Sequence, residues 1–83
     1  MSLFVVLKMF KVLMLDYAQV LFSGNARSVI LPGERGVFEI LNFHSPIVSM
    51  LNEGDVIIDG EVFPIRRGIV NFYHNELIAL VER

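Results

Sequence analysis

Residues 22–46 constrain the fold of this chain most strongly, because they contain its densest series of turn signals. Ser23-Gly24 interrupts one apolar run near the start of this stretch. Residues 32–36, Pro-Gly-Glu-Arg-Gly, predict a tight loop, since proline fixes φ and glycine can take φ > 0. The apolar residues 37–41 follow, and Pro46 then holds the residue before it in an extended conformation. This order predicts strand, turn, strand, loop, strand.

The chain has 83 residues, which we assign to one domain spanning residues 1–83. A domain of this size buries only about 60–65% of the surface of its unfolded chain. Because 54% of the residues are hydrophobic, we expect part of this apolar surface to face a partner. The alternative is a dense core with scattered apolar residues on the surface. The net charge of −2 and the scattered basic residues argue against binding to nucleic acid, which requires a concentrated basic face.

Short apolar segments separated by turn signals predict an all-β domain, either a sandwich or a flattened barrel. No long window shows a sustained helical period, so no helix of consequence is predicted. Asp59-Gly60 fits a two-residue type I′ hairpin turn, and Pro64 belongs at a sheet edge or a bulge because it cannot donate to a ladder. Asn75 is expected to adopt the left-handed conformation in the last hairpin. The predicted strands are residues 10–15, 18–22, 27–31, 37–41, 47–51, 56–58, 61–65, 68–73 and 77–81.

The apolar segment of residues 3–15 does not fit a membrane anchor. It is too short, and with Lys8 and Lys11 too charged, to span a bilayer, and it lacks the arrangement of a signal peptide. We interpret it as a leader followed by the first strand, with Met9 as an alternative start. Residues 10–15 alternate poorly between apolar and polar side chains, as expected for a strand that is covered on both faces.

The sequence offers few candidates for catalysis or metal binding. His44 and His74 are far apart in a chain without cysteine, whereas a metal site needs several ligands at suitable spacing. Each histidine is therefore interpreted as a loop residue that makes hydrogen bonds. No serine lies in a nucleophile elbow, and residues 33–36 lack the ending of a phosphate-binding loop. We predict no catalytic residue, no metal and no cofactor.

One ordered set of residues runs through most of the chain: Phe22-Ser23-Gly24, Val29 to Gly33, Glu34, Gly36, Phe38, Ile40-Leu41, His44, Pro46, Leu51, Gly54, Val56, Ile58, Gly68, Asn75 and Leu80. This set resembles a known family, the N-terminal domain of the epsilon subunit of F-type ATP synthases, which is called delta in mitochondria. The similarity extends over residues 9–83. The chain departs from the family pattern at four places: Val37 stands where an acidic residue is common, Glu39 where glycine is common, Asn42-Phe43 where Pro-Gly is common, and Arg66-Arg67-Gly68 where Ser-Gly-Gly is common.

The resemblance implies a ten-stranded, two-sheet β-sandwich without the C-terminal helical hairpin of the family. That hairpin carries the family's inhibition of ATP hydrolysis and, in some members, an ATP site, so we expect neither here. The implied function is that of a non-catalytic rotor subunit in the central stalk, which couples proton or sodium-ion translocation to ATP synthesis. The implied partners are the gamma subunit and the polar loops of the c-ring, at the cytoplasmic face of the bacterial inner membrane or its organellar equivalent. The membrane is contacted only through the complex.

The resemblance also implies two interfaces. A loop stiffened by proline and glycine loses less entropy on docking, and an exposed aromatic residue beside a polar group is typical of an interface anchor. The alternative for Phe43 is that it folds back into the core while His44 caps the loop. Two other functions stay open: a small β-barrel that binds a ligand or peptide, and a cupin-type metalloenzyme. The predicted residues are Gly33, Glu34, Arg35, Val37 and Glu39 on the c-ring side, and Phe43, His44, Ser45 and Ser49 on the gamma side.

Overall fold

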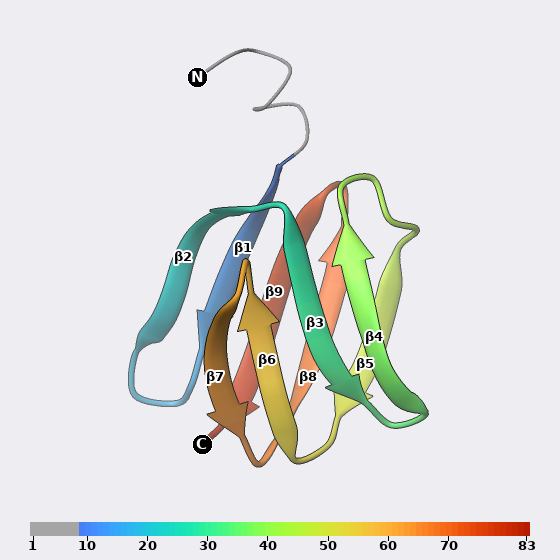
Figure 1. Ribbon diagram of the computed structural model, residues 1–83. Helices are drawn as coiled ribbons and strands as arrows, with labels where there is room; N and C mark the ends of the chain where they lie inside the picture. Colours follow the sequence, from blue (N-terminus) through green and yellow to red (C-terminus); the bar gives the residue numbers. More distant parts are fainter. Residues whose placement is uncertain (1–8) are drawn as a thin grey trace.

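The computed structural model describes residues 9–83, which form nine β-strands and no helix (Figure 1). The all-β prediction is confirmed, with nine strands where the resemblance implied ten. The predicted leader lies outside the described residues. The strands are β1 (Phe10–Leu15), β2 (Val20–Ala26), β3 (Ser28–Gly33), β4 (Gly36–Leu41), β5 (Ile47–Leu51), β6 (Gly54–Ile58), β7 (Glu61–Ile65), β8 (Arg67–Tyr73) and β9 (Glu76–Glu82).

The nine strands form one hydrogen-bonded sheet that folds over into two layers. The strand order is β2-β1-β9-β8-β5-β3-β6-β7, and β4 pairs with the other side of β3. The fold-over lies between β5 and β3, which are paired at one position, Leu51 with Gly33. We call β2-β1-β9-β8-β5 the first layer and β4-β3-β6-β7 the second layer, which crosses in front of the first in Figure 1. Among the described strands, β1 and β9 are the one parallel pair.

The core lies between the layers, because alternate residues of each strand point to opposite faces. Phe10 of β1 meets Phe72 of β8 edge to face, with ring centroids 5.4 Å apart. Phe22 of β2 and Phe63 of β7 do the same at 6.3 Å, and so join the outermost strands of the two layers. Among residues 9–83 no polar or charged residue is buried as a whole, although the Asp16 side chain, which pairs with Arg83, is only 6% exposed. Apolar burial between the layers therefore stabilises the sandwich.

Three predictions about turns and edges are confirmed. Asp59 and Gly60 have φ of 47° and 86°, as a type I′ turn requires. Pro64 lies in β7, which is an edge strand of the second layer. Asn75 has φ of 59°, and the residue before it, His74, also has a positive φ of 51°.

Two predicted boundaries are wrong. Ser23-Gly24 does not end the second strand, since β2 continues through both residues, which pair with β1. β2 is an edge strand with exposed side chains at these positions, so residues of low β-propensity are tolerated there. Pro32 and Gly33 are buried residues of β3 rather than loop residues. Only Glu34-Arg35 remains as the turn between β3 and β4.

Candidate docking surfaces

The outward side of the first layer carries two apolar rows that run across the strands. Strand pairing aligns Met50, Ile69, Leu80 and Leu15 in one row. The same pairing aligns Val48, Ile78 and Leu13 in the other row, with a polar asparagine of β8 between the first two. The apolar residues of these rows that lie on β5, β8 and β9 are between 38% and 66% exposed. A soluble monomer rarely exposes a contiguous apolar patch of this kind unless it serves an interface. We call these residues the apolar strip: Leu13, Leu15, Val48, Met50, Ile69, Ile78 and Leu80.

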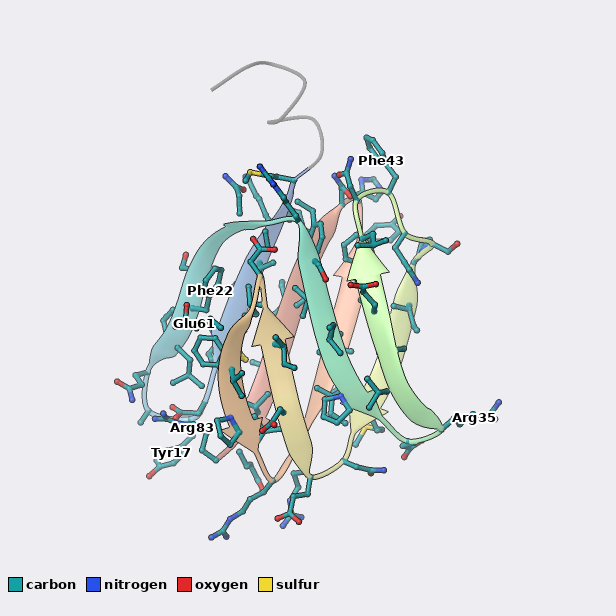
Figure 2. The ribbon with its side chains drawn as sticks, viewed as in Figure 1. Tyr17, Phe22, Arg35, Phe43, Glu61 and Arg83 are labelled. Atoms are coloured by element: carbon teal, nitrogen blue, oxygen red, sulfur yellow. The ribbon has the colours of Figure 1, made fainter. Side chains whose placement is uncertain are left out.

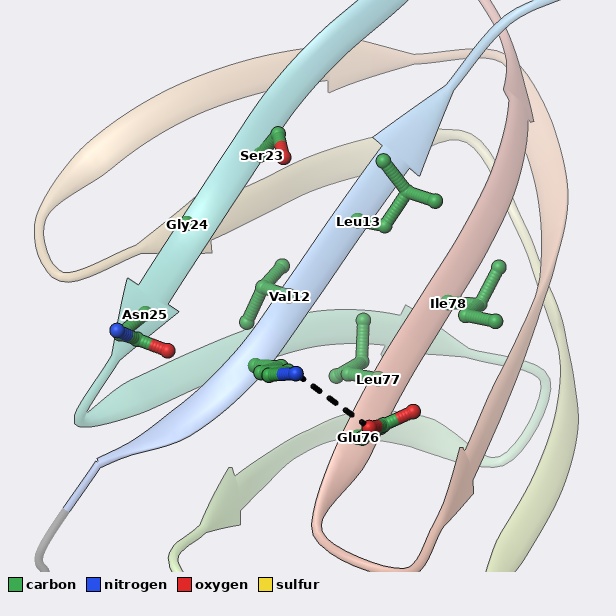
Figure 3. A pocket seen from close by; sticks show the side chains of 9 residues that line it. Val12, Leu13, Ser23, Gly24, Asn25, Glu76, Leu77 and Ile78 are labelled. Carbon is green, nitrogen blue, oxygen red and sulfur yellow. Dashed lines mark ion pairs between the residues drawn. The ribbon is translucent and has the colours of Figure 1, made fainter.

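Ion pairs flank the apolar strip at both ends of the strands. Lys11 Nζ lies 3.9 Å from Glu76 Oε1, and Arg67 Nε lies 2.7 Å from Glu82 Oε2. Figure 3 shows the first pair beside a groove lined by residues of β1, β2 and β9, among them Leu13 of the strip. All four charged side chains are more than half exposed. The strip therefore has an apolar centre and a polar rim of paired charges, and docking interfaces likewise have an apolar core within a polar rim.

The loop between β4 and β5, residues 42–46, holds Phe43 away from the core. The N–H of His44 donates to the carbonyl of Leu41 at 3.1 Å and closes a turn in which Phe43 is the third residue. Phe43 has φ of 61° and its side chain is 76% exposed, pointing outward in Figure 2. The alternative in which Phe43 folds back into the core is therefore excluded.

The other residues predicted for the gamma side differ in accessibility. Ser45 is exposed, whereas His44 is half-buried, with Nδ1 donating to the carbonyl of Ser45 at 2.7 Å. The His44 ring also meets the Phe72 ring edge to face at 6.1 Å. Ser49 is half-buried, and its Oγ donates to the carbonyl of Met50 at 3.0 Å. The residues on both sides of Ser49, Val48 and Met50, belong to the apolar strip, so the alternation of the strand places the Ser49 side chain on the opposite face.

The turn between β3 and β4 lies at the opposite end of β4 from Phe43, as the labels of Arg35 and Phe43 show in Figure 2. Glu34 and Arg35 are exposed, and the side chain of Val37 is 74% exposed. Three of the five residues predicted for the c-ring side thus present accessible side chains at one end of β4, Glu34 and Arg35 on the turn and Val37 at the start of the strand. The Phe43 loop is thus separated from this turn by the length of β4. Ser49, by contrast, lines one groove together with Glu34, Arg35 and Val37.

The remaining two residues predicted for the c-ring side have other surroundings. Gly33 is buried, and a Cβ added there would lie 2.7 Å from the ring of Phe38. Gly33 therefore shapes the turn and offers no side chain to a partner. Glu39 lies along β4 rather than on the turn, and it accepts a hydrogen bond of 2.6 Å from Ser28 Oγ.

Residues 9–83 hold neither a cluster of metal-binding side chains nor a membrane span made of helix. In this part of the chain no group of three or more His, Cys, Asp or Glu side chains is placed to hold a metal ion. No helix formed by the same residues is long and apolar enough to cross a membrane.

A comparison with protein families matches residues 9–83 to the family described as ATP synthase, Delta/Epsilon chain, beta-sandwich domain. The chain belongs to this family. It is 40% identical over 67 residues to the ATP synthase epsilon chain of a Nitratiruptor species, a match that covers 75% of this chain and 52% of the relative. It is 32% identical over 80 residues to the ATP synthase epsilon chain of Chlorobium limicola, covering 90% of this chain and 91% of the relative. The chain thus spans about half the length of the first relative and most of the second.

Two solved structures share the fold of this delta/epsilon domain. A chain of the Euglena gracilis mitochondrial ATP synthase (OSCP/F1/c-ring) superposes with a TM-score of 0.83 at 11% identity, covering 92% of this chain and 52% of that chain. A chain of the Tetrahymena thermophila mitochondrial ATP synthase (central stalk/c-ring) gives 0.76 at 15% identity, covering 88% and 63%. At these identities the likeness shows the fold.

The apolar strip of this delta/epsilon domain is the surface that the sequence analysis did not locate. Residues 77–81 are five consecutive apolar residues, so their strand presents apolar side chains on both faces. The poor alternation of residues 10–15 has the same origin, but the expected cover on both faces is only partial: on the outward side Leu13 and Leu15 are half-buried and Lys11 is exposed. The sequence does not reveal that these two strands lie side by side.

Proposed function

We propose that this chain is a non-catalytic rotor subunit in the central stalk of an F-type ATP synthase. It docks on the gamma subunit and on the polar loops of the c-ring, and it couples proton or sodium-ion translocation to ATP synthesis. Membership of the delta/epsilon family supports the proposal, as do relatives that are themselves named ATP synthase epsilon chain. The subunit works at the cytoplasmic face of the bacterial inner membrane or its organellar equivalent, and it reaches the membrane through the complex.

The observation that carries the docking role is the apolar strip. We combine it with the Phe43 loop because Val48 and Met50 of the strip lie on β5, the strand that follows the loop. We assign this combined surface to gamma, together with His44, Ser45 and Ser49. We assign the β3–β4 turn, with Glu34, Arg35 and Val37, to the c-ring, together with Gly33 and Glu39. Because the turn and the Phe43 loop lie at opposite ends of β4, the domain can contact both partners at once.

A subunit that couples the movement of two partners needs a rigid arrangement of its contact surfaces and no catalytic residues. The proposed contact residues lie on strands or on short connections between paired strands, and the core between the layers is apolar throughout. A surface that is ordered before binding loses less conformational entropy when it docks. These properties suit a part that transmits movement between two partners.

The test compares two substitutions of equal exposure on different layers. Leu80 of the strip is 49% exposed, and Val62 on the outward side of the second layer is 51% exposed. Leu80→Gln should weaken calorimetric binding to purified gamma by more than about 1 kcal/mol, whereas Val62→Gln should change it by a few tenths. Both variants should unfold near the wild-type temperature. Equal affinities would contradict the assignment of the strip, and a wild-type chain that does not bind gamma would contradict the proposed function.

A second pair of substitutions tests the loop. Phe43→Ala should weaken gamma binding by more than about 1 kcal/mol with little change in thermal stability, because the ring is exposed. His44→Ala should also lower stability, since the imidazole packs against Phe72. A large loss of stability in Phe43→Ala, with binding retained by the folded fraction, would show that Phe43 is not an anchor.

A further inference from the structure

One side chain connects the β4–β5 loop to the β8–β9 turn. Asn75 Oδ1 accepts a hydrogen bond from the N–H of Phe43 at 2.8 Å, and Asn75 Nδ2 donates to Asn42 Oδ1 at 2.7 Å. The carbonyl of Asn75 also accepts from the N–H of Lys11 at 3.3 Å. The amide of Asn75 thus joins two segments that are more than thirty residues apart in sequence.

The bond to Phe43 coincides with an unfavourable backbone conformation. Phe43 has φ of 61°, in the left-handed region that a bulky residue rarely adopts. The third position of a turn with positive φ normally takes glycine or asparagine. Such a conformation persists when the surrounding structure holds it. The N–H of Phe43 is held by Asn75, and the carbonyl of Leu41 closes the turn around it.

We propose that Asn75 is a positioning residue for docking, which locks the β4–β5 loop so that the Phe43 ring is presented in advance to an apolar pocket of gamma. The inference rests on the proposed function. The Phe43 ring carries no polar atom and is 76% exposed, so an apolar pocket is the environment it fits. Two exposed rings lie next to Asn75 in the sequence, those of Tyr73 and His74, with centroids 4.0 Å apart and planes tilted by 41°.

The effect on binding follows from the population of the docking conformation. When only a fraction of the molecules adopts the conformation that can bind, the apparent affinity equals the intrinsic affinity multiplied by that fraction. One hydrogen bond of this kind changes such a population by about two- to tenfold. Without the Asn75 amide, the loop can relax to negative φ and direct the ring elsewhere. Asn75 therefore acts through Phe43 and need not touch gamma itself.

The first measurement needs no partner. Asn75→Gly keeps the left-handed backbone and the carbonyl that Lys11 uses, but it removes the amide. The N–H of Phe43 should then exchange with solvent about two- to tenfold faster in NMR hydrogen exchange. Asn75→Asp keeps an oxygen acceptor at the same position and should retain slow exchange. Equal exchange rates in the wild type and Asn75→Gly would overturn the proposal.

The second measurement is affinity for purified gamma. Asn75→Gly should weaken binding by about two- to tenfold, and Asn75→Asp should bind like the wild type. In a Phe43→Ala background, Asn75→Gly should have no further effect, because the residue that it positions is gone. Two losses that simply add would overturn the positioning role. If Phe43→Ala alone leaves binding unchanged, the proposed anchor fails, while the exchange measurement still decides whether Asn75 holds the loop.

Discussion

The carboxylate of Asp59 ties the β6–β7 hairpin to the start of β3. Asp59 Oδ1 accepts hydrogen bonds from the N–H groups of Arg27 and Ser28, both at 3.0 Å. The N–H of Asp59 donates in return to the carbonyl of Ser28 at 3.0 Å. Asp59→Ala removes the acceptor of two hydrogen bonds, each with a net contribution of about 1 kcal/mol. Alanine at φ of 47° adds about 1 kcal/mol of strain, so the free energy of unfolding should fall by about 2–3 kcal/mol.

Thermal unfolding measures this loss directly. In a domain of this size, 1 kcal/mol corresponds to about 4–8 °C in Tm, so Asp59→Ala should unfold about 8–24 °C below the wild type. Asp59→Asn is the control, because asparagine keeps one oxygen acceptor and tolerates positive φ. It should lose about 1 kcal/mol or less. The reasoning would be refuted by an alanine variant as stable as the wild type, or by an asparagine variant as unstable as the alanine one.

Three further predictions concern backbone strain and pH. Gly60→Val should lower the free energy of unfolding by about 1–2 kcal/mol, because a β-branched residue is strained at φ of 86°. An added Cβ would meet no atom within 4 Å, so the loss measures backbone strain, and Gly60→Asn should be nearly neutral. An unchanged unfolding midpoint for the valine variant would mean another turn type. Phe43→Gly should be more stable than Phe43→Ala by about 1 kcal/mol in denaturant unfolding, with equal loss of gamma binding. The pKa of Asp16 lies below its ordinary value of 3.8, chiefly because its carboxylate accepts a hydrogen bond from the N–H of Ala18. The N–H of Gln19 and the Arg83 side chain lower this pKa further, and desolvation opposes them. The stabilisation that the ionised Asp16 carboxylate contributes is present above pH 3.8 and is lost as the pH falls through the lower pKa of the folded state. Asp16→Asn should therefore make the free energy of unfolding fall less steeply at acid pH. An unchanged acid dependence of stability would contradict this prediction.

The parts of the fold that sequence could predict are those with local causes. The Asp59-Gly60 turn depends on two adjacent residues that accept positive φ, and β5 is bounded by a proline on one side and an Asn-Glu-Gly turn on the other. The end of β2 could not be predicted in this way. Ser23-Gly24 has the composition of a turn, but pairing with β1 extends the strand through it.

The docking surfaces depend on contacts between distant segments. Residues 11–15 pair in parallel with residues 76–80, and this pairing places the strip residues of β1 beside those of β9. The bond between Phe43 and Asn75 likewise spans 32 residues. Periodicity indicates that a strand has two apolar faces, but it contains no information about which strand lies beside it. The candidate residues, placed by family resemblance, all lie in one continuous stretch from position 33 to position 49, whereas the apolar strip joins four strands and required the structure.

Strand β9 shows how one segment can serve the core and an interface independently. Its inward residues, Leu77, Ala79 and Val81, are at most 4% exposed, while Ile78 and Leu80 between them are 44% and 49% exposed. Because the side-chain period of a strand is two, a substitution on the outward side leaves the core packing in place. We therefore expect substitutions at positions 78 and 80 to change the strength of the proposed docking while the fold is retained.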